Sequence, residues 1–213
     1  MKGAIYSKEL EQARTEGRVA TVPYDAALPV DTDWDLGIGD AMAIWFSQST
    51  RSGEVRLIDY YENSGEGFPH YAALLSSKPY RYGKHWAPHD ISVRELSSGR
   101  TRQEVALSHG LRFEVTPRLH SQAGNEVEEG IHAARMLFSR CWFDGVKCKV
   151  GIEALMHYRR DYNERLNEFK ATPVHDWASH GADAFRGLAV RHQVPIERKK
   201  AASVRIPGDW MSA

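Results

Sequence analysis

Residues 31–62 contain three strand-like runs in succession, with no room for a helix between them. DTDWDLG is strand-like and ends in a turn at Gly37–Asp40, AMAIWFSQ is apolar and compatible with a strand, and EVRLIDYYE follows the short turn RSG. Strands joined by tight turns pair antiparallel, because parallel pairing needs a long crossover. The sequence therefore predicts an antiparallel three-stranded meander, and the remaining elements must pair with it or pack against it.

The later segments alternate between helical and strand-like patterns. Thr101 and Glu104 form a capping box, and Gly110 is a typical helix stop. Crossovers of this kind predict parallel strands, so we expect an α/β fold whose mixed sheet has helices on both faces. The expected helices are 7–16, 68–77, 101–110, 125–140, about 146–163 and 179–192, and the further strands are 84–90, which ends at Asp90, and 111–117.

Composition and absent motifs exclude several classes of protein. The 213 residues suffice for one domain, and 28 basic residues balance 28 acidic ones, which argues against bulk coating of nucleic acid but allows local basic patches. No apolar run approaches the ~20 residues that span a bilayer. Cys141 and Cys148 are expected as free thiols. The usual phosphate-loop, dinucleotide, nucleophile-elbow and H-E-x-x-H motifs are missing, so ATP or dinucleotide binding by the usual routes is not expected.

Three aspartates stand where strands end or a helix begins. Asp35 is near the end of the first strand, Asp90 ends the fourth, and Asp183 is expected in or near the first turn of the last helix. Clustered carboxylates repel one another, and hard divalent cations such as Mg²⁺ or Mn²⁺ remove that repulsion. Two such ions can hydrolyse a phosphodiester. The alternative is structural, because aspartates are also common at turns and helix starts.

Three motifs carry a resemblance to a known family. WDLGIGDAMAIWF, APHD and DWASHGADAFRGLA resemble the C-terminal nuclease domain of the large terminase subunit of tailed bacteriophages, and the resemblance extends from about Gly3 to His192. It implies a ribonuclease H-like fold and a metal-dependent endonuclease that cleaves concatemeric viral double-stranded DNA during packaging. It also places Asp35, Asp90 and Asp183 at the three metal-binding positions of a site that uses two Mg²⁺ or Mn²⁺ ions.

The resemblance also implies partners and an organisation of the chain. The partners would be double-stranded DNA, an N-terminal ATPase domain, the portal protein and the small terminase subunit, with no membrane. We expect residues 1–30 to connect to an ATPase motor, 31–194 to form the nuclease domain and 195–213 to form a tail. The expected location is the host cytoplasm during virion assembly, without secretion.

Several neighbouring residues have two interpretations. Asp40 either joins the metals or stabilises a turn, and Asp33, which faces the same way as Asp35, either joins the site or stands at the strand's entrance or surface. His180 is a candidate for the outer shell or a phosphate contact, and Ser179 for the helix N-cap. Arg186 either pairs with an acid or reaches a DNA phosphate. The basic residues expected nearest to DNA are Arg94, Arg100 and Arg102.

Other functions remain open from the sequence alone. One is another ribonuclease H-like nuclease of the resolvase type, and another is a portal-docking module with a weak or vestigial site. A zinc or iron hydrolase built on His89–Asp90, His175–Asp176 and His180 is a third, although their spacing matches no motif. By itself, His89 is expected to be a structural histidine.

Overall fold

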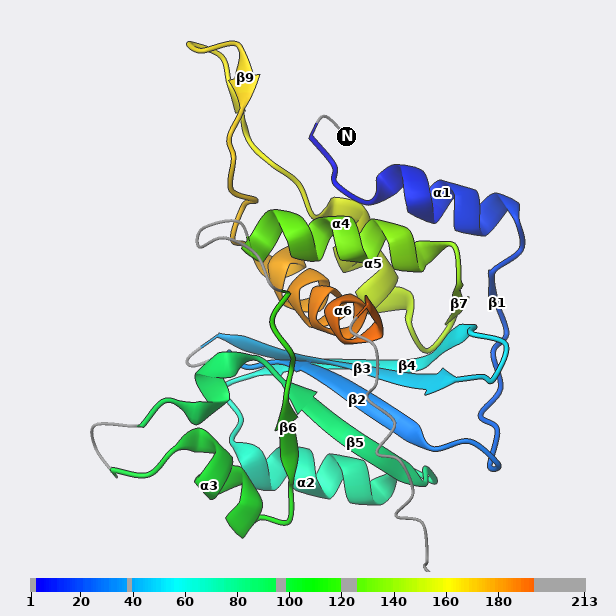
Figure 1. Ribbon diagram of the computed structural model, residues 1–213, viewed down its shortest axis with the longest axis vertical. Helices are drawn as coiled ribbons and strands as arrows, with labels where there is room; N and C mark the ends of the chain where they lie inside the picture. Colours follow the sequence, from blue (N-terminus) through cyan, green and yellow to red (C-terminus); the bar gives the residue numbers. More distant parts are fainter. Residues whose placement is uncertain (1–2, 38–39, 95–98, 120–125, 194–213) are drawn as a thin grey trace, which may run out of the picture.

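A mixed sheet of seven strands lies between two layers of helices (Figure 1). The computed structural model describes residues 3–37, 40–94, 99–119 and 126–193. The strands lie in the order β1-β7-β4-β3-β2-β5-β6. Their bounds are β1 Val19–Ala20, β2 Val30–Asp35, β3 Ala41–Ser49, β4 Val55–Ser64, β5 Tyr82–Ala87, β6 Phe113–Val115 and β7 Cys141–Asp144.

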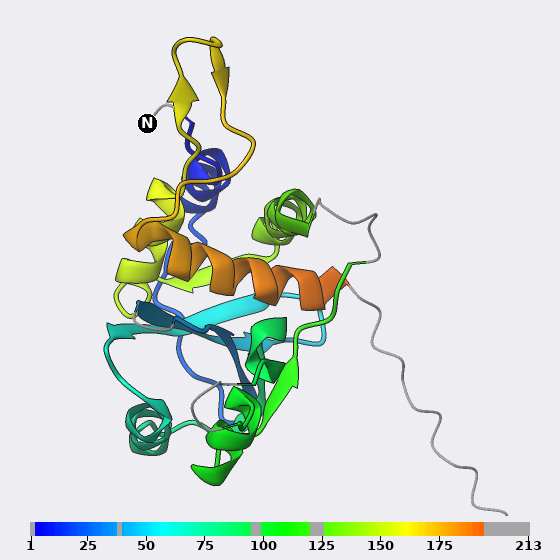
Figure 2. The ribbon, with the colours of Figure 1, turned by 90° about the vertical axis from the view of Figure 1, so that its left-hand side faces the viewer.

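Helices cover both faces of the sheet, as the sequence predicts. The long helix α6 runs across one face together with α1, α4 and α5, and α2 and α3 lie on the other face (Figures 1 and 2). The bounds are α1 Ser7–Thr15, α2 Phe68–Ser77, α3 Arg102–Ser108, α4 Glu126–Phe138, α5 Lys149–His157 and α6 Trp177–Gln193, with a 3₁₀ turn, η1, at His89–Ser92.

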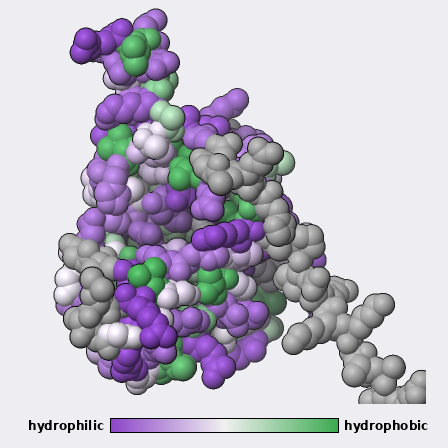
Figure 3. Space-filling model, turned by 60° about the vertical axis from the view of Figure 1, so that its left-hand side comes forward, coloured by the Kyte–Doolittle hydropathy of each residue, from purple (hydrophilic) through white to green (hydrophobic). Residues whose placement is uncertain are grey.

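A small hairpin stands clear of this body. It consists of β8 (Tyr162–Asn163) and β9 (Glu168–Phe169), paired antiparallel. It projects from the side of the sheet that carries α4 and α5 (Figure 2). Hydrophobic groups appear only as isolated spots on the face that Figure 3 presents, which is otherwise mostly hydrophilic.

The predicted meander is confirmed. Strand β3 pairs antiparallel with both β2 and β4, whereas β5 and β7 add to the two sides of the meander in parallel. Along β3, Trp45 faces α6, and Ile44 and Phe46 face the opposite layer. This alternation puts apolar residues on both faces, so the strand is buried at the centre of the molecule.

Two expectations between residues 141 and 163 are wrong. CWFD, which is not among the strands predicted from the sequence, is the parallel strand β7 between β1 and β4. A four-residue strand buried on both faces has no alternation to reveal it. The helix expected over 146–163 is α5, which ends at His157, and the residues beyond it lead into the hairpin.

The first thirty residues contribute to the core. Tyr6, Leu10 and Ala13 of the N-terminal segment are fully buried, and β1 extends the sheet. The predicted tail, 195–213, lies outside the described residues. Among the residues that are described, no helix combines the length and apolarity needed to cross a membrane. Cys141 and Cys148 are buried and free.

Candidate active site

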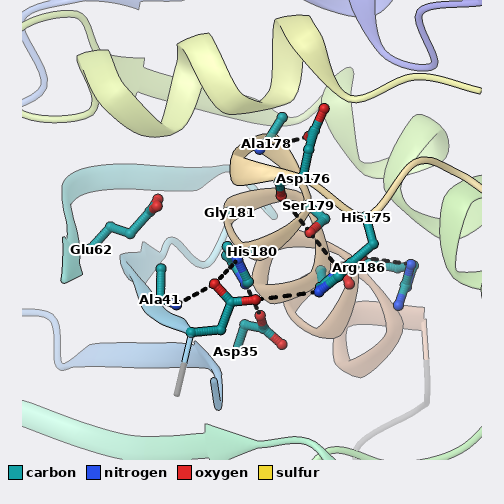
Figure 4. Close-up of polar contacts among 12 residues, drawn as sticks. Asp35, Ala41, Glu62, His175, Asp176, Ala178, Ser179, His180, Gly181 and Arg186 are labelled. Atoms are coloured by element: carbon teal, nitrogen blue, oxygen red, sulfur yellow. Dashed lines mark hydrogen bonds and ion pairs between the residues drawn. The ribbon is translucent and has the colours of Figure 1, made fainter. Parts of the chain in front are cut away.

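Asp35 lies at the end of β2 and reaches helix α6. His180 Nδ1 is 3.1 Å from Asp35 Oδ2, and the imidazole is almost completely buried. The hydrogen bond to Asp35 raises the pKa of His180 against the opposing effect of burial. Figure 4 shows the histidine between its helix and the strand.

The helix can come this close to the sheet because of a glycine. Trp45 Nε1 donates to the carbonyl oxygen of Gly181 at 2.8 Å. A Cβ atom at residue 181 would lie 2.7 Å from the Tyr60 hydroxyl, closer than such atoms approach in proteins. The glycine therefore sets the height of α6 above Asp35.

Asp183 lies in the second turn of α6, two residues further from the helix start than the sequence predicts. The helix begins at Trp177, and Asp176, not Ser179, caps it, because Asp176 Oδ1 accepts from the backbone N–H of Ala178 at 3.0 Å. Ser179 is inside the helix, and its hydroxyl donates to the Asp176 carbonyl oxygen. Position in the first turn therefore does not account for an acid at residue 183.

The carboxylate of Asp183 has two partners. Arg186 Nη1 is 2.8 Å from Asp183 Oδ1, and the Tyr158 hydroxyl donates to the same oxygen at 3.3 Å. Burial raises the pKa of Asp183; the charge of Arg186 opposes this, and the charge of Asp35 adds to it. The arginine pairs with an acid, which is one of the two roles expected for it.

Asp90 is not at the end of a strand. Strand β5 stops at Ala87, and Asp90 lies in the following 3₁₀ turn, where Arg102 Nη1 approaches its Oδ2 atom at 3.1 Å. Asp90 Oδ1 is buried and has no hydrogen-bond partner among the described residues. The neighbouring His89 belongs to the same turn and lines a pocket that also contains Asp35 and Asp183.

A pocket of about 220 Å³ brings Asp35 and Asp183 together between the sheet and helices α4 and α6. Its other charged or ionisable lining residues are His89, Arg118, Glu126, Glu129 and Arg186.

The donor chemistry of the three aspartates fits a hard divalent cation, although they are not assembled around one. Each uses one oxygen for a basic side chain, His180, Arg102 or Arg186, and the other oxygen has no hydrogen bond or ion pair with a described residue. Asp90 Oδ1 is one of the buried side-chain atoms that lack a hydrogen-bond partner among the described residues, a state that a bound cation would relieve. No three His, Cys, Asp or Glu side chains in the described part of the chain lie close enough together to hold a metal ion.

Asp40 is connected to the site through histidines. Its Oδ1 atom is 3.2 Å from His180 Nε2, and its Oδ2 atom is 3.4 Å from His175 Nε2. The backbone N–H of Ala41 and then the charge of His180 lower the pKa of Asp40. Asp40 therefore supports His180 from the side opposite Asp35.

Of the three basic residues expected near DNA, Arg102 is engaged with Asp90. Arg94 bridges to Thr101 and donates to the Gly99 carbonyl oxygen. Arg100 donates to the backbone of Glu104. These arginines thus surround the start of α3, next to Asp90 rather than in the pocket lining.

Sequence reasoning missed two residues beside the site. Tyr158, which contacts Asp183, follows the end of α5. Glu62 stands in register with Ala43, which is in register with Asp35, so Glu62 occupies the same row two strands away (Figure 4). The register of the predicted meander was the signal that could have located Glu62.

The chain shares its fold with the nuclease domains of large terminases from several bacteriophages. The P22 large terminase nuclease domain superposes with a TM-score of 0.58 at 18% identity, covering 81% of this chain and 86% of that one. The large terminase nuclease of thermophilic phage G20c with bound cobalt gives 0.56 at 12%, covering 90% and 97%. The nuclease domain of the large terminase from bacteriophage SPP1 with bound Mn gives 0.53 at 16%, covering 75% and 84%.

A longer neighbour is about twice the length of the part that matches. The large terminase of another thermophilic bacteriophage superposes with a TM-score of 0.61 at 16% identity, and the match covers 88% of this chain but 44% of that protein. No family model and no curated protein matches the chain. The resemblance to large terminase nuclease domains that the sequence motifs indicate is thus accompanied by a similarity of fold to solved domains of that kind.

Proposed function

We propose that this chain is the DNA-cleaving domain of a viral large terminase, a metal-dependent endonuclease. The observation that carries the proposal is that Asp35, Asp90 and Asp183 each have one carboxylate oxygen with a partner and one without. Each carboxylate is fixed through one oxygen by a basic side chain, and the other oxygen has no hydrogen bond or ion pair with a described residue. An acid that is held in this way is oriented but still able to bind a ligand.

In this proposal Asp35 and Asp183 hold divalent cations in their common pocket, and Asp90 supplies the third carboxylate. Two Mg²⁺ or Mn²⁺ ions would activate a water molecule and stabilise the leaving oxygen of the phosphodiester. His180 orients Asp35, and its link to Asp40 holds the ring in place. Outer partners of this kind commonly fix metal ligands.

The proposed substrate is concatemeric viral double-stranded DNA, cut during packaging in the host cytoplasm. Arg94 and Arg100, at the start of α3 beside Asp90, are the proposed phosphate contacts, so cleavage should be sensitive to salt and little dependent on sequence. We further propose that residues 1–30 follow an ATPase domain, and that the portal and the small subunit are partners of the whole protein.

Plasmid cleavage with Mn²⁺, Mg²⁺ or EDTA tests the proposal. Asp35→Asn, Asp90→Asn and Asp183→Asn should each lower the cleavage rate at least about a hundredfold, because metal-assisted stabilisation is worth several kcal/mol. Asp161→Asn is the control, since this acid belongs to an exposed ion pair with Lys170. Cleavage by the three variants at the parental rate would overturn the proposed site.

Two further substrates separate the alternative functions. Preference for a four-way junction over linear duplex would favour a resolvase-type nuclease. Binding to a portal protein without cleavage in any metal would favour a docking module.

A further inference from the structure

Arg186, Tyr158 and Asp183 form a closed triangle of polar contacts beside the pocket. Arg186 Nη1 approaches Asp183 Oδ1 at 2.8 Å and donates to the Tyr158 hydroxyl at 3.1 Å, and that hydroxyl donates to the same Asp183 oxygen. Both contacts reach Oδ1. No described residue contacts Oδ2, although the side chain is 28% exposed in the pocket lining.

A glycine in the neighbouring helix makes this position of the arginine possible. A Cβ atom at Gly130 of α4 would lie 2.4 Å from both Cγ and Cδ of Arg186. The stem of the arginine therefore crosses α4 where that helix has no side chain. Its guanidinium group is fixed by α4 along its stem, by Tyr158 at its end and by Asp183 on its own helix.

This constraint distinguishes Arg186 from a surface arginine that happens to find an acid. Only 21% of its side chain is exposed, and burial of a guanidinium group is costly unless the charge is matched. Another arginine of the same helix, Arg191, contacts both oxygens of its partner Asp33. Arg186 contacts one, and the geometry leaves the second oxygen of Asp183 to a different ligand.

We propose that Arg186, held by Gly130 and Tyr158, is a positioning residue that fixes Oδ1 of Asp183 and presents Oδ2 to a divalent cation. This inference rests on the proposed function. It assigns to Arg186 a role in metal binding that needs no contact with DNA. Arg186 reaches Asp183 and Tyr158 through Nη1 alone, so a phosphate contact would instead use its other guanidinium nitrogens.

Binding of Mn²⁺ alone, measured by calorimetry without DNA, tests the inference. Arg186→Gln should weaken Mn²⁺ binding about 10–100-fold, as loss of such outer partners commonly does. Tyr158→Phe removes one hydrogen bond and should weaken it about fivefold. Gly130→Ala displaces the arginine stem and should weaken binding in the same direction. Arg186→Lys keeps the charge and should recover part of the affinity.

Arg159→Gln is the matched control. Arg159 pairs with Asp176 at 2.6 Å at the start of the same helix, and its partner is the helix cap rather than a pocket acid. This variant should bind Mn²⁺ like the parent. Cleavage by Arg186→Gln should return toward the parental rate as Mn²⁺ is raised, which a purely structural defect would not do.

The outcomes separate this inference from the function on which it rests. If the parent chain binds no Mn²⁺, the proposed function fails and the inference fails with it. If the parent binds Mn²⁺ and a folded Arg186→Gln variant binds it equally well, only the positioning role is overturned. A weaker affinity for DNA with unchanged Mn²⁺ binding would likewise overturn it, in favour of a phosphate contact.

Discussion

Helix α6 carries two arginines that each face an aspartate, and the two pairs differ in how completely the acid is satisfied. Arg191 contacts both carboxylate oxygens of Asp33, at 2.7 and 2.9 Å, and both side chains are almost fully buried. Arg186 contacts one oxygen of Asp183 at the edge of a pocket. The same pair of residue types therefore fastens α6 to the sheet at Arg191 and, in our proposal, prepares a metal ligand beside Arg186.

The comparison extends to strand β2, where Asp33 and Asp35 are two residues apart and face the same helix. The sequence left two roles open for Asp33, in the site or at the strand's entrance or surface. The structure shows neither, because Asp33 is outside the pocket lining, is 1% exposed and is paired with Arg191. Asp35 keeps one oxygen free of described contacts. Burial and the number of satisfied oxygens, rather than residue type, separate a structural acid from a candidate ligand.

The largest expected effect on stability is at the fully satisfied pair. Arg191→Gln leaves the Asp33 carboxylate buried without its counter-charge, so the free energy of unfolding should fall by about 3–5 kcal/mol in urea titrations. Arg159→Gln, in a partly exposed pair, should cost at most about 1 kcal/mol. Equal losses in the two variants would contradict the distinction between the pairs.

A smaller effect is expected at Gly181, where α6 lies close to the sheet. Gly181→Ala would force its new methyl group against the Tyr60 hydroxyl and should destabilise the fold by about 1–3 kcal/mol. Gly187→Ala is the control in the same helix, because its nearest neighbour is 3.8 Å away, and it should leave stability unchanged or raise it slightly. A harmless Gly181→Ala would mean that the contact with Tyr60 does not set the height of the helix.

The smallest expected effect is a pH-dependent difference between the parent and Asp183→Asn. Burial raises the pKa of Asp183 above its ordinary value of 3.8, so the ionised form is less stable in the folded chain than in the unfolded one. Relative to the variant, the parent should be most stable below pH 3.8 and lose stability as the pH rises through the raised pKa. Urea titrations in EDTA measure this difference, and a difference that grows with pH would have the wrong sign.

The sequence predicts the elements whose signals are local. The meander follows from strand-like runs and short turns, and the capping box of Thr101 and Glu104 is present in α3 as expected. The prediction of secondary structure fails where an element is very short or where two nearby residues could both cap a helix. Strand β7 has four residues, and the start of α6 depends on Asp176, whose capping competes with that of Ser179 in the same stretch of sequence.

The candidate acids could be named from the sequence, but the side chains that contact them could not. His180 and Asp35 are separated by 145 residues, and Arg186 reaches Tyr158 across 28. Such pairs arise from the packing of α6 on the sheet and on α5, which no local pattern encodes. The prediction of Asp35, Asp90 and Asp183 as metal ligands therefore stays a prediction, with its surroundings now defined.

The two outermost strands of the sheet have a consequence for how copies of this chain behave together. Strand β1 has two residues and β6 has three, and the Phe113 carbonyl oxygen of β6 already accepts from Gln103. Long exposed edge strands are the templates on which chains stack into aggregates. With such short edges, β1 and β6 offer little for a second copy to extend, so the chain should resist self-association through these two strands even when concentrated.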